Sequence, residues 1–332
     1  MGMGKKACPP VLMIDGEEIS RDCITEYLGD VFNSEGNNKD LFKDRLKRGI
    51  KAMVGIQAFM SENSFGKYTI GIHVLLYRMV FSASILFNAE VWTGVSDSSL
   101  RELTALQVKF LKKVLGVRKS TANSFVFLEL GLLPLSYEID IRSLSFLHHI
   151  LTLSDDDPVK SLFNSFLQLP EYPNWVTNVK RLMKKYSINL NFDEVSVMPK
   201  EKYKSIVKKS VEKVAFNNLT KECKLLKRTQ YLTYNELKIQ SYLLHLSPKF
   251  SKLISQARSQ TLDIKSQSAF KYSDNDCRWC FLEEETLDHI INCGEDLPYI
   301  DAALGTINRC EDFSKIETIG QRIHYFLEKV TE

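Results

Sequence analysis

Residues 41–60, LFKDRLKRGIKAMVGIQAFM, decide the fold class because their apolar side chains recur at steps of three and four residues. That period places one apolar stripe along an α-helix and leaves the opposite face to polar side chains. The apolar stripe consists of Leu46, Ile50, Met53, Ile56 and Met60. The opposite face carries Lys43, Lys47 and Lys51 at steps of four, with Arg45 and Arg48 beside them. The segment therefore predicts a helix with one packed side and one basic side.

Helical patterns continue after this segment. We expect a helix over residues 68–92, and another that starts at the capping box Ser99-x-x-Glu102 and ends at Gly116. A further helix is expected over residues 136–153. Because the connections are short, the pattern indicates an antiparallel helical bundle.

The middle of the chain is expected to be a helical linker. Asp157 and Pro158 fit the N-cap and first position of a helix. Pro170, Pro173 and Pro199 then divide the sequence into shorter helices, because proline ends or kinks a helix.

The first 36 residues are predicted to form strands. VLMI and EEIS, residues 11–14 and 17–20, flank Asp15-Gly16, which fits the two-residue turn of a β-hairpin. A further short strand is expected at YLGDVF, residues 27–32. The expected fold class is therefore mainly α, with a short N-terminal β-hairpin and strand.

Composition describes an ordinary soluble globular protein of 332 residues, 44% hydrophobic and 26% charged. The net charge is +3, but residues 199–228 hold ten Lys or Arg against three Glu, whereas residues 281–332 hold four against twelve Asp or Glu. A basic segment ahead of an acidic tail suits a polyanion-binding surface, although lysine-rich helices are commonly just solvated.

Cysteine usage and the lack of a signal-peptide pattern point to an intracellular protein, and both nucleus and cytoplasm fit. The seven cysteines are not arranged as the dense framework of a small secreted domain, which favours a reducing compartment. Cys8 and Pro9 stand where a signal peptide needs an apolar core. The most apolar stretch, residues 70–92, contains Arg78 and Glu90 and does not fit a bilayer span, so we expect no membrane partner.

Residues 277–293, CRWCFLEEETLDHIINC, have the spacing Cys-x2-Cys-x8-His-x3-Cys. A Cys-x2-Cys turn supplies two thiolates, and zinc in structural sites takes four such sulfur or imidazole ligands. His289 and Cys293 are four apart and would lie on one face of a helix. We therefore predict structural zinc, bound by Cys277, Cys280, His289 and Cys293.

The alternative is that these residues simply pack in a small core with Trp279. The acidic residues between the second and third ligand leave few apolar side chains for such a core, which favours the metal. With four protein ligands the site is closed and has no position for a catalytic water.

An ordered set of short stretches resembles the C-terminal part of a non-long-terminal-repeat retrotransposon reverse transcriptase. The resemblance covers about residues 11–295. It is carried by IDGEE, EYLGDVF, DRLKRGIKA, LFNAEVW, LTALQVKFLKKVLGV and ELGLLPL, followed by the Cys-Cys-His-Cys cluster. None of these stretches is specific alone, but their order is.

The resemblance implies four regions. Residues 1–36 would be the end of the palm, with Tyr27, Leu28 and Gly29 in the primer grip, and residues 37–153 would be a thumb-like helical bundle. Residues 154–262 would be a helical linker with the basic segment, and residues 263–332 would hold the zinc knuckle and acidic tail.

The sequence also departs from the family pattern. The fingers and catalytic palm would precede residue 11, and the family's aromatic-x-Asp-Asp turn, which holds the catalytic metals, is missing. The one Asp-Asp stretch, residues 155–157, fits a helix cap. We therefore expect a truncated product that is not an enzyme as it stands.

The expected function is binding of template or primer, as RNA or an RNA–DNA hybrid, without polymerase activity. The expected contacts are Lys43, Lys47, Lys51, Arg45, Arg48, Lys204, Lys208, Lys209 and Trp279. Trp279 would stack on a base or, alternatively, belong to the core of the knuckle. The alternative function is a zinc-stapled helical scaffold for protein interactions, derived from a retroelement.

Overall fold

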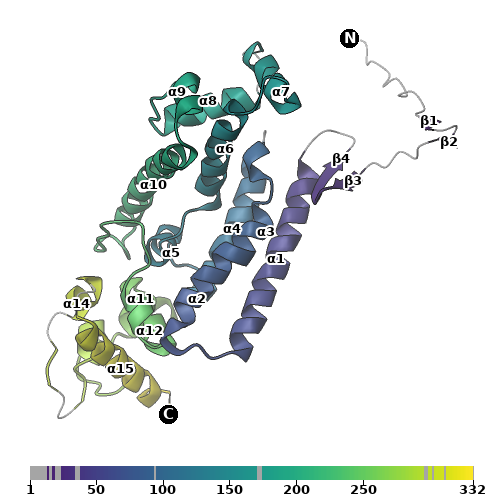
Figure 1. The fold of residues 1–332 in the computed structure, drawn as a ribbon. Coiled ribbons are helices and arrows are strands. Elements are labelled where there is room, and N and C mark those ends of the chain that lie inside the picture. Colours follow the sequence, from purple (N-terminus) through teal and green to yellow (C-terminus); the bar gives the residue numbers. More distant parts are fainter. Residues whose placement is uncertain are drawn as a thin grey trace, which may run out of the picture. The chain divides into compact units, whose positions relative to one another are not determined.

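The computed structural model describes residues 13–14, 17–18, 24–33, 38–92, 95–169, 174–294, 298–300, 303–309 and 312–331. The chain divides into two compact units, Met1–Asp44 and Arg45–Glu332. Helices dominate the described residues, and the strands lie near the N-terminus (Figure 1). The predicted mainly helical fold class is confirmed.

The first unit contains the predicted N-terminal hairpin. Strand β1 (Met13–Ile14) pairs antiparallel with β2 (Glu17–Glu18), with Ile14 opposite Glu17. The predicted turn residues Asp15 and Gly16 lie outside the described residues.

The predicted single strand over residues 27–32 is wrong, because the chain reverses within it. Strand β3 (Ile24–Tyr27) pairs antiparallel with β4 (Asp30–Asn33), and Leu28 and Gly29 form the turn between them. Both turn residues have positive φ, 48° and 83°, which an extended strand does not allow. Tyr27 and Leu28 project at this tip and are 66% and 74% exposed.

Helix α1 (Lys39–Glu62) begins in the first unit and continues into the second, as the period of its sequence predicts. Within the second unit Met53 and Ile56 are buried, whereas Ile50 is 43% exposed. The predicted apolar stripe is therefore correct in part.

The helix predicted over residues 68–92 is interrupted. A 3-10 turn (Gly66–Tyr68) leads into α2 (Thr69–Leu76), a π-helix (Tyr77–Ser82), α3 (Ala83–Ile85) and a second 3-10 turn (Ala89–Val91). The segment still presents side chains to the core at a helical spacing. The rings of Tyr77 and Phe81, four residues apart, stack at 5.4 Å, and both stack on Phe110.

Helix α4 (Asp97–Leu115) starts one turn earlier than predicted. Ser96 is its N-cap, and the Ser96 hydroxyl accepts a hydrogen bond from the Ser99 amide at 3.1 Å. Ser99 is thus the third helical residue and not the cap. Gly116, with φ 66°, ends the helix as predicted.

A second group of helices packs around a large apolar cluster that includes Leu147, Trp175, Val179, Tyr203 and Val207. Asp157 caps α7 as predicted, because its carboxylate accepts from the Val159 amide at 2.8 Å. These helices are α5 (Asn123–Leu130), α6 (Leu135–Leu151), α7 (Pro158–Leu167), α8 (Trp175–Lys185), α9 (Phe192–Val197) and α10 (Lys200–Leu225).

The C-terminal helices are held to α5 by a buried ion pair. Glu129 on α5 and Arg258 on α12 are both fully buried and lie 2.8 Å apart. The elements of this region are α11 (Tyr242–His245), α12 (Pro248–Arg258), 3-10 turns at Lys265–Gln267 and Ala269–Lys271, α13 (Leu287–Ile290), α14 (Ala303–Arg309) and α15 (Phe313–Lys329).

Candidate metal centre

The first two predicted ligands sit on a tight turn. The Cys277 amide donates to the carbonyl of Glu283 at 2.7 Å, and the Phe281 amide donates to the carbonyl of Cys277 at 3.0 Å. Phe281 has a positive φ of 57°, which is uncommon for a residue with a bulky side chain. The backbone therefore curls around the position where the two sulfurs converge.

Backbone amides point at both sulfurs of this turn. The Trp279 amide lies 3.4 Å from Cys277 Sγ, and the Leu282 amide lies 3.5 Å from Cys280 Sγ. Such N–H groups stabilise the thiolate over the thiol, because they place a positive partial charge beside the sulfur. The thiolate is the form that binds a metal.

The third ligand sits on α13 and the fourth lies beyond it. Thr286 caps this short helix, and its hydroxyl accepts from the His289 amide at 3.2 Å. The prediction that His289 and Cys293 share a helix is wrong, because α13 ends at Ile290. The chain still turns back after Ile290 and brings Cys293 to the cluster.

The four predicted ligands form one cluster. Their ligand atoms all lie within 4.8 Å of one another. Cys277 Sγ and Cys293 Sγ are 3.8 Å apart, and Cys280 Sγ and His289 Nε2 are 3.3 Å apart. Zinc bonds of about 2.3 Å to sulfur and 2.0 Å to nitrogen, arranged tetrahedrally, need separations of roughly this size. The cluster can therefore hold a metal ion.

Burial and neighbouring charges affect the thiols differently. Burial opposes ionisation of Cys280, but hydrogen bonds from the amides of Leu282 and Glu283 and from the Cys293 and Cys277 thiols together outweigh it and lower its pKa to about 7. Burial and the neighbouring Cys277 raise the pKa of Cys293. Several thiolates this close repel one another, so a bound cation would favour their ionised forms.

Sequence reasoning missed one residue of this site, Glu283. Its carboxylate lies 3.0 Å from His289 Nδ1, while Nε2 of the same ring faces Cys280. A carboxylate on one ring nitrogen orients the other toward a metal. The sequence shows a run of three glutamates, residues 283–285, but not which of them faces the histidine.

A second carboxylate fixes the turn to the rest of the unit. Glu285 is fully buried and accepts from the Arg278 guanidinium at 2.6 Å and from the Lys265 amide at 3.0 Å. After the third ligand, Arg322 of α15 donates to the carbonyl of Ile291 at 3.0 Å. The cluster is thus tied to the segment before it and to the last helix.

Trp279 is a packing residue. Its ring meets Tyr325 edge-on at 5.5 Å and lies 6.2 Å from Phe326, both on α15. Trp279 is half-buried, which fits the alternative of a knuckle core residue, and its stacking on a base stays a prediction. The exposed apolar side chains of this region are instead Phe281, Leu282 and Tyr299.

The predicted basic face of α1 is exposed at its lysines. Lys43 in the first unit, and Lys47 and Lys51 in the second, are exposed, and Lys43 pairs with Asp40 at 3.2 Å. Arg45 departs from the prediction: it is fully buried, with its guanidinium 5.1 Å from the centre of the Phe87 ring. Arg48 is half-buried.

A surface hollow of about 550 Å³ lies between α1 and the segment from the π-helix to Phe87. Arg48, Lys51, Met79 and Phe87 line it. Met79 is 65% exposed and Phe87 is 43% exposed. Cations and an accessible aromatic ring therefore meet at one place, which the sequence pattern of α1 alone did not indicate.

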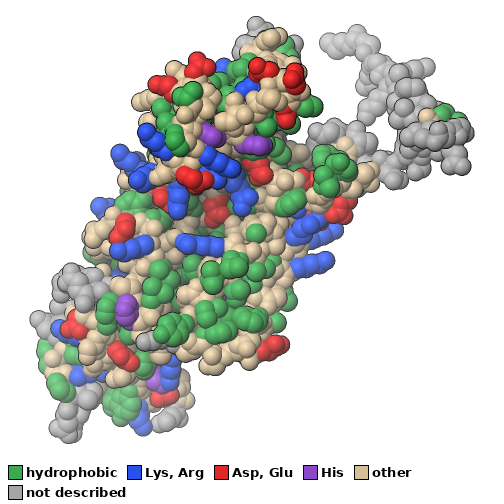
Figure 2. Space-filling view, in the orientation of Figure 1, with side chains coloured by type: hydrophobic (Ala, Val, Ile, Leu, Met, Phe, Trp, Pro, Cys, Tyr) green, Lys and Arg blue, Asp and Glu red, His purple; other side chains and the backbone are tan. Residues whose placement is uncertain are grey.

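The second predicted basic cluster lies along α10. Lys208 and Lys209 are exposed, whereas Lys204 is half-buried. Lys204 lies 3.6 Å from Glu201, and Lys208 lies 3.8 Å from Glu212. Figure 2 shows lysine and arginine side chains gathered along α10 and along part of α1.

Comparison with protein-family models, curated proteins and solved structures finds no match to this chain. Among the described residues, no helix has the length and apolar character needed to cross a membrane. The function is therefore inferred from the site and the surface.

Proposed function

We propose that this chain is a zinc-containing nucleic-acid-binding module of the reverse-transcriptase kind, which holds template or primer by its phosphate backbone. The ordered stretches that resemble the C-terminal part of such an enzyme support the proposal. The aromatic-x-Asp-Asp turn that would hold catalytic metals is absent from the 332 residues, so we expect no primer extension by this chain alone.

The observation that carries the proposal is the hollow beside α1. Lys51 and Arg48 supply positive charge at its wall, and Lys47 lies one turn before Lys51 on the same helix. The partly exposed Phe87 ring lies in the same hollow. Cations that follow a phosphate backbone, next to an aromatic ring that stacks on a base, are the usual means of holding single strands.

Salt dependence tests the phosphate contacts. Binding of a labelled single-stranded RNA is measured by fluorescence anisotropy over a series of salt concentrations, because each phosphate contact releases counterions. Removing Lys43, Lys47 and Lys51 together should flatten the plot of log affinity against log salt by about 0.7 per lost contact. Affinity should fall alike for all sequences, because phosphate contacts do not read bases.

Phe87→Ala separates stacking from charge. We expect this change to weaken binding by about 1–3 kcal/mol per stacked base while the salt slope stays the same. Lys204, Lys208 and Lys209 on α10 are removed separately and together with the α1 lysines, because this second basic cluster would mask the effect if it binds independently. An unaltered slope after the triple lysine change, with intact folding, would contradict the proposed surface.

We propose zinc as the metal because three thiolates and one imidazole at tetrahedral separations are its usual structural ligands. Metal analysis of the purified protein should find about one zinc per chain. Cys280→Ser should remove it, whereas Cys223→Ser, at a buried thiol beside the Thr229 carbonyl, should not. A folded protein with no metal would refute the assignment.

A further inference from the structure

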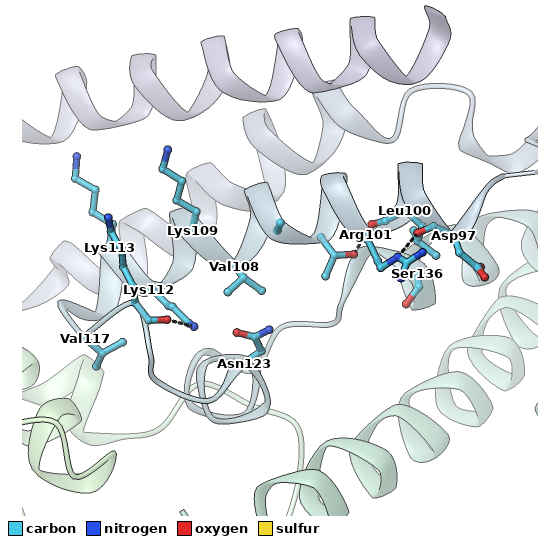
Figure 3. A pocket seen from close by; sticks show the side chains of 13 residues that line it. Asp97, Leu100, Arg101, Val108, Lys109, Lys112, Lys113, Val117, Asn123 and Ser136 are labelled. Atoms are coloured by element: carbon cyan, nitrogen blue, oxygen red, sulfur yellow. Dashed lines mark hydrogen bonds between the residues drawn. The ribbon is translucent and has the colours of Figure 1, made fainter. Parts of the chain in front are cut away.

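A groove of about 1050 Å³ runs along α4 and shares no lining residue with the cluster or with the hollow beside α1 (Figure 3). One wall is α4 between Asp97 and Lys113. The other side is formed by Val117 and Lys119 after the helix, and by Asn123 and Ser136, which lie in the first turns of α5 and α6.

Most of the surface that lines this groove is apolar. Leu100, Ala105 and Val108 follow one another on one face of α4, and Val117 continues the apolar surface. Ala105 is exposed, Leu100 and Val117 are half-buried, and Val108 is buried at the floor of the strip. An apolar strip of this kind on a helix face gains free energy when a partner covers it, because apolar surface leaves water.

The charged residues of the groove are almost all cations. Its lining contains one carboxylate, Asp97, against five basic residues: Arg101, Lys109, Lys112, Lys113 and Lys119. In Figure 3, Lys109 and Lys113 extend to one side of α4 and Lys112 to the other. The apolar strip is therefore bordered by positive charge on both sides.

Three of these cations have neutral partners within the chain. Lys112 Nζ donates to the carbonyl of Lys119 at 2.7 Å, and Lys113 Nζ donates to the side-chain oxygen of Gln57 at 2.7 Å. Arg101 Nε donates to the carbonyl of Asp97 at 3.1 Å. Within the described part of the chain, none of the five forms an ion pair with a carboxylate. On α10, by contrast, Lys204 and Lys208 are paired with glutamates of the same helix.

The shape and chemistry favour a peptide over a nucleic acid here. None of the side chains that line the groove is aromatic, so a base would find no ring to stack on, unlike in the hollow with Phe87. An amphipathic helix places apolar side chains at i, i+3, i+4 and i+7 into such a groove, and acidic residues flanking them would meet the basic borders.

We propose that the α4 groove binds an acidic amphipathic helix of a partner protein. This binding goes beyond the proposed nucleic-acid function, and it uses different residues. The helix would lie along α4 with its apolar side chains over Leu100 and Ala105 and its carboxylates beside Lys109 and Lys112.

A pair of synthetic peptides tests the proposal with the full chain. The first is a labelled helix-forming peptide of about four turns, with leucine at i, i+3, i+4 and i+7 and glutamate beside them. The second has lysine in place of every glutamate. We expect saturable binding of the acidic peptide, measured by fluorescence anisotropy, and affinity for the basic peptide that is at least about tenfold weaker.

Two variants locate the binding. Ala105→Trp fills the groove at an exposed position, where the substitution does not disturb the core, and should weaken acidic-peptide binding about tenfold or more. Lys109→Ala combined with Lys112→Ala should weaken it and reduce its salt dependence. The control, Lys204→Ala combined with Lys209→Ala on α10, should leave binding unchanged.

Several results would overturn the proposal. These are an acidic peptide that does not bind, equal affinity for the two peptides, or full binding by Ala105→Trp. Single-stranded RNA that competes with the peptide, and that also loses affinity in Ala105→Trp, would make the groove a nucleic-acid site instead. Circular dichroism of each variant confirms that the helices are intact.

Discussion

The Glu129–Arg258 pair and the Cys-His cluster both fasten the C-terminal helices, yet only the first is complete with protein groups alone. The Glu129 carboxylate accepts from Arg258, Tyr234 and Tyr242, with the tyrosine hydroxyls at 2.6 and 2.7 Å. Arg258 also donates to the carbonyls of Ile307 and Asn308 at 2.6 and 3.0 Å. Every charge there has a partner of opposite sign or a polar one.

The cluster is assembled differently. It brings three sulfurs and an imidazole together, and none of these four ligands is a fixed cation. The backbone amides of Trp279 and Leu282 beside two of the sulfurs favour thiolates. Negative groups that converge in this way repel one another until a cation is bound. The difference leads us to propose that α12 is fixed by folding alone, whereas the turn from Cys277 to Cys293 is completed by a metal.

Breaking the ion pair should have the largest effect. Arg258→Ala leaves the Glu129 carboxylate buried without its cation, so we expect the free energy of unfolding to fall by about 3–5 kcal/mol. Chemical denaturation followed by circular dichroism measures this loss. The matched control is Arg181→Ala on α8, where the exposed arginine bonds Asn178 and its removal should cost little. Equal losses of stability in Arg258→Ala and Arg181→Ala would contradict the conclusion that the buried ion pair fixes α12.

Removing the carboxylate behind the histidine should have a smaller effect, confined to the cluster. Glu283→Ala removes the partner that orients His289, so metal affinity should fall about 10–100-fold. Competition with a chelator of known affinity measures it. Glu283→Gln keeps an oxygen acceptor and should lose less, and Glu284→Ala should lose nothing. A loss in Glu284→Ala as large as in Glu283→Ala would assign the effect to the overall charge of the acidic run.

The helix cap should have the smallest effect. Thr286→Ala removes the oxygen that accepts from the His289 amide, and loss of such a cap costs about 1 kcal/mol. Hydrogen exchange at the amides of His289 and Ile290 should report the easier opening of α13. Thr286→Ser retains the hydroxyl and should restore protection. Unchanged exchange in Thr286→Ala would mean that the metal alone orders α13.

Local patterns predicted much of this molecule. The period of residues 41–60 gave α1, the Asp157-Pro158 pair gave the start of α7, and Gly116 gave the end of α4. The spacing of four residues, Cys277, Cys280, His289 and Cys293, gave the cluster. These predictions succeed because a helix period, a cap and a Cys-x2-Cys turn depend on residues a few positions apart.

The errors have local causes as well. Leu28-Gly29 reverses the chain inside an expected strand because both residues take positive φ. The π-helix from Tyr77 to Ser82 interrupts an expected helix, and the apolar pattern gives no sign of it, because the residues stay helical and buried on one side.

Other features depend on partners far along the chain. Arg45 carries a charge and lies in a basic run, but its burial near Phe87, 42 positions away, removes it from the surface. Trp279 packs against Tyr325 of α15, 46 positions later, and Glu129 acquires its role from an arginine 129 positions later. The sequence shows which side chains are charged, apolar or able to bind metal. Which of them face one another is decided by tertiary packing, because contacts between distant segments depend on how all the helices fill the core together.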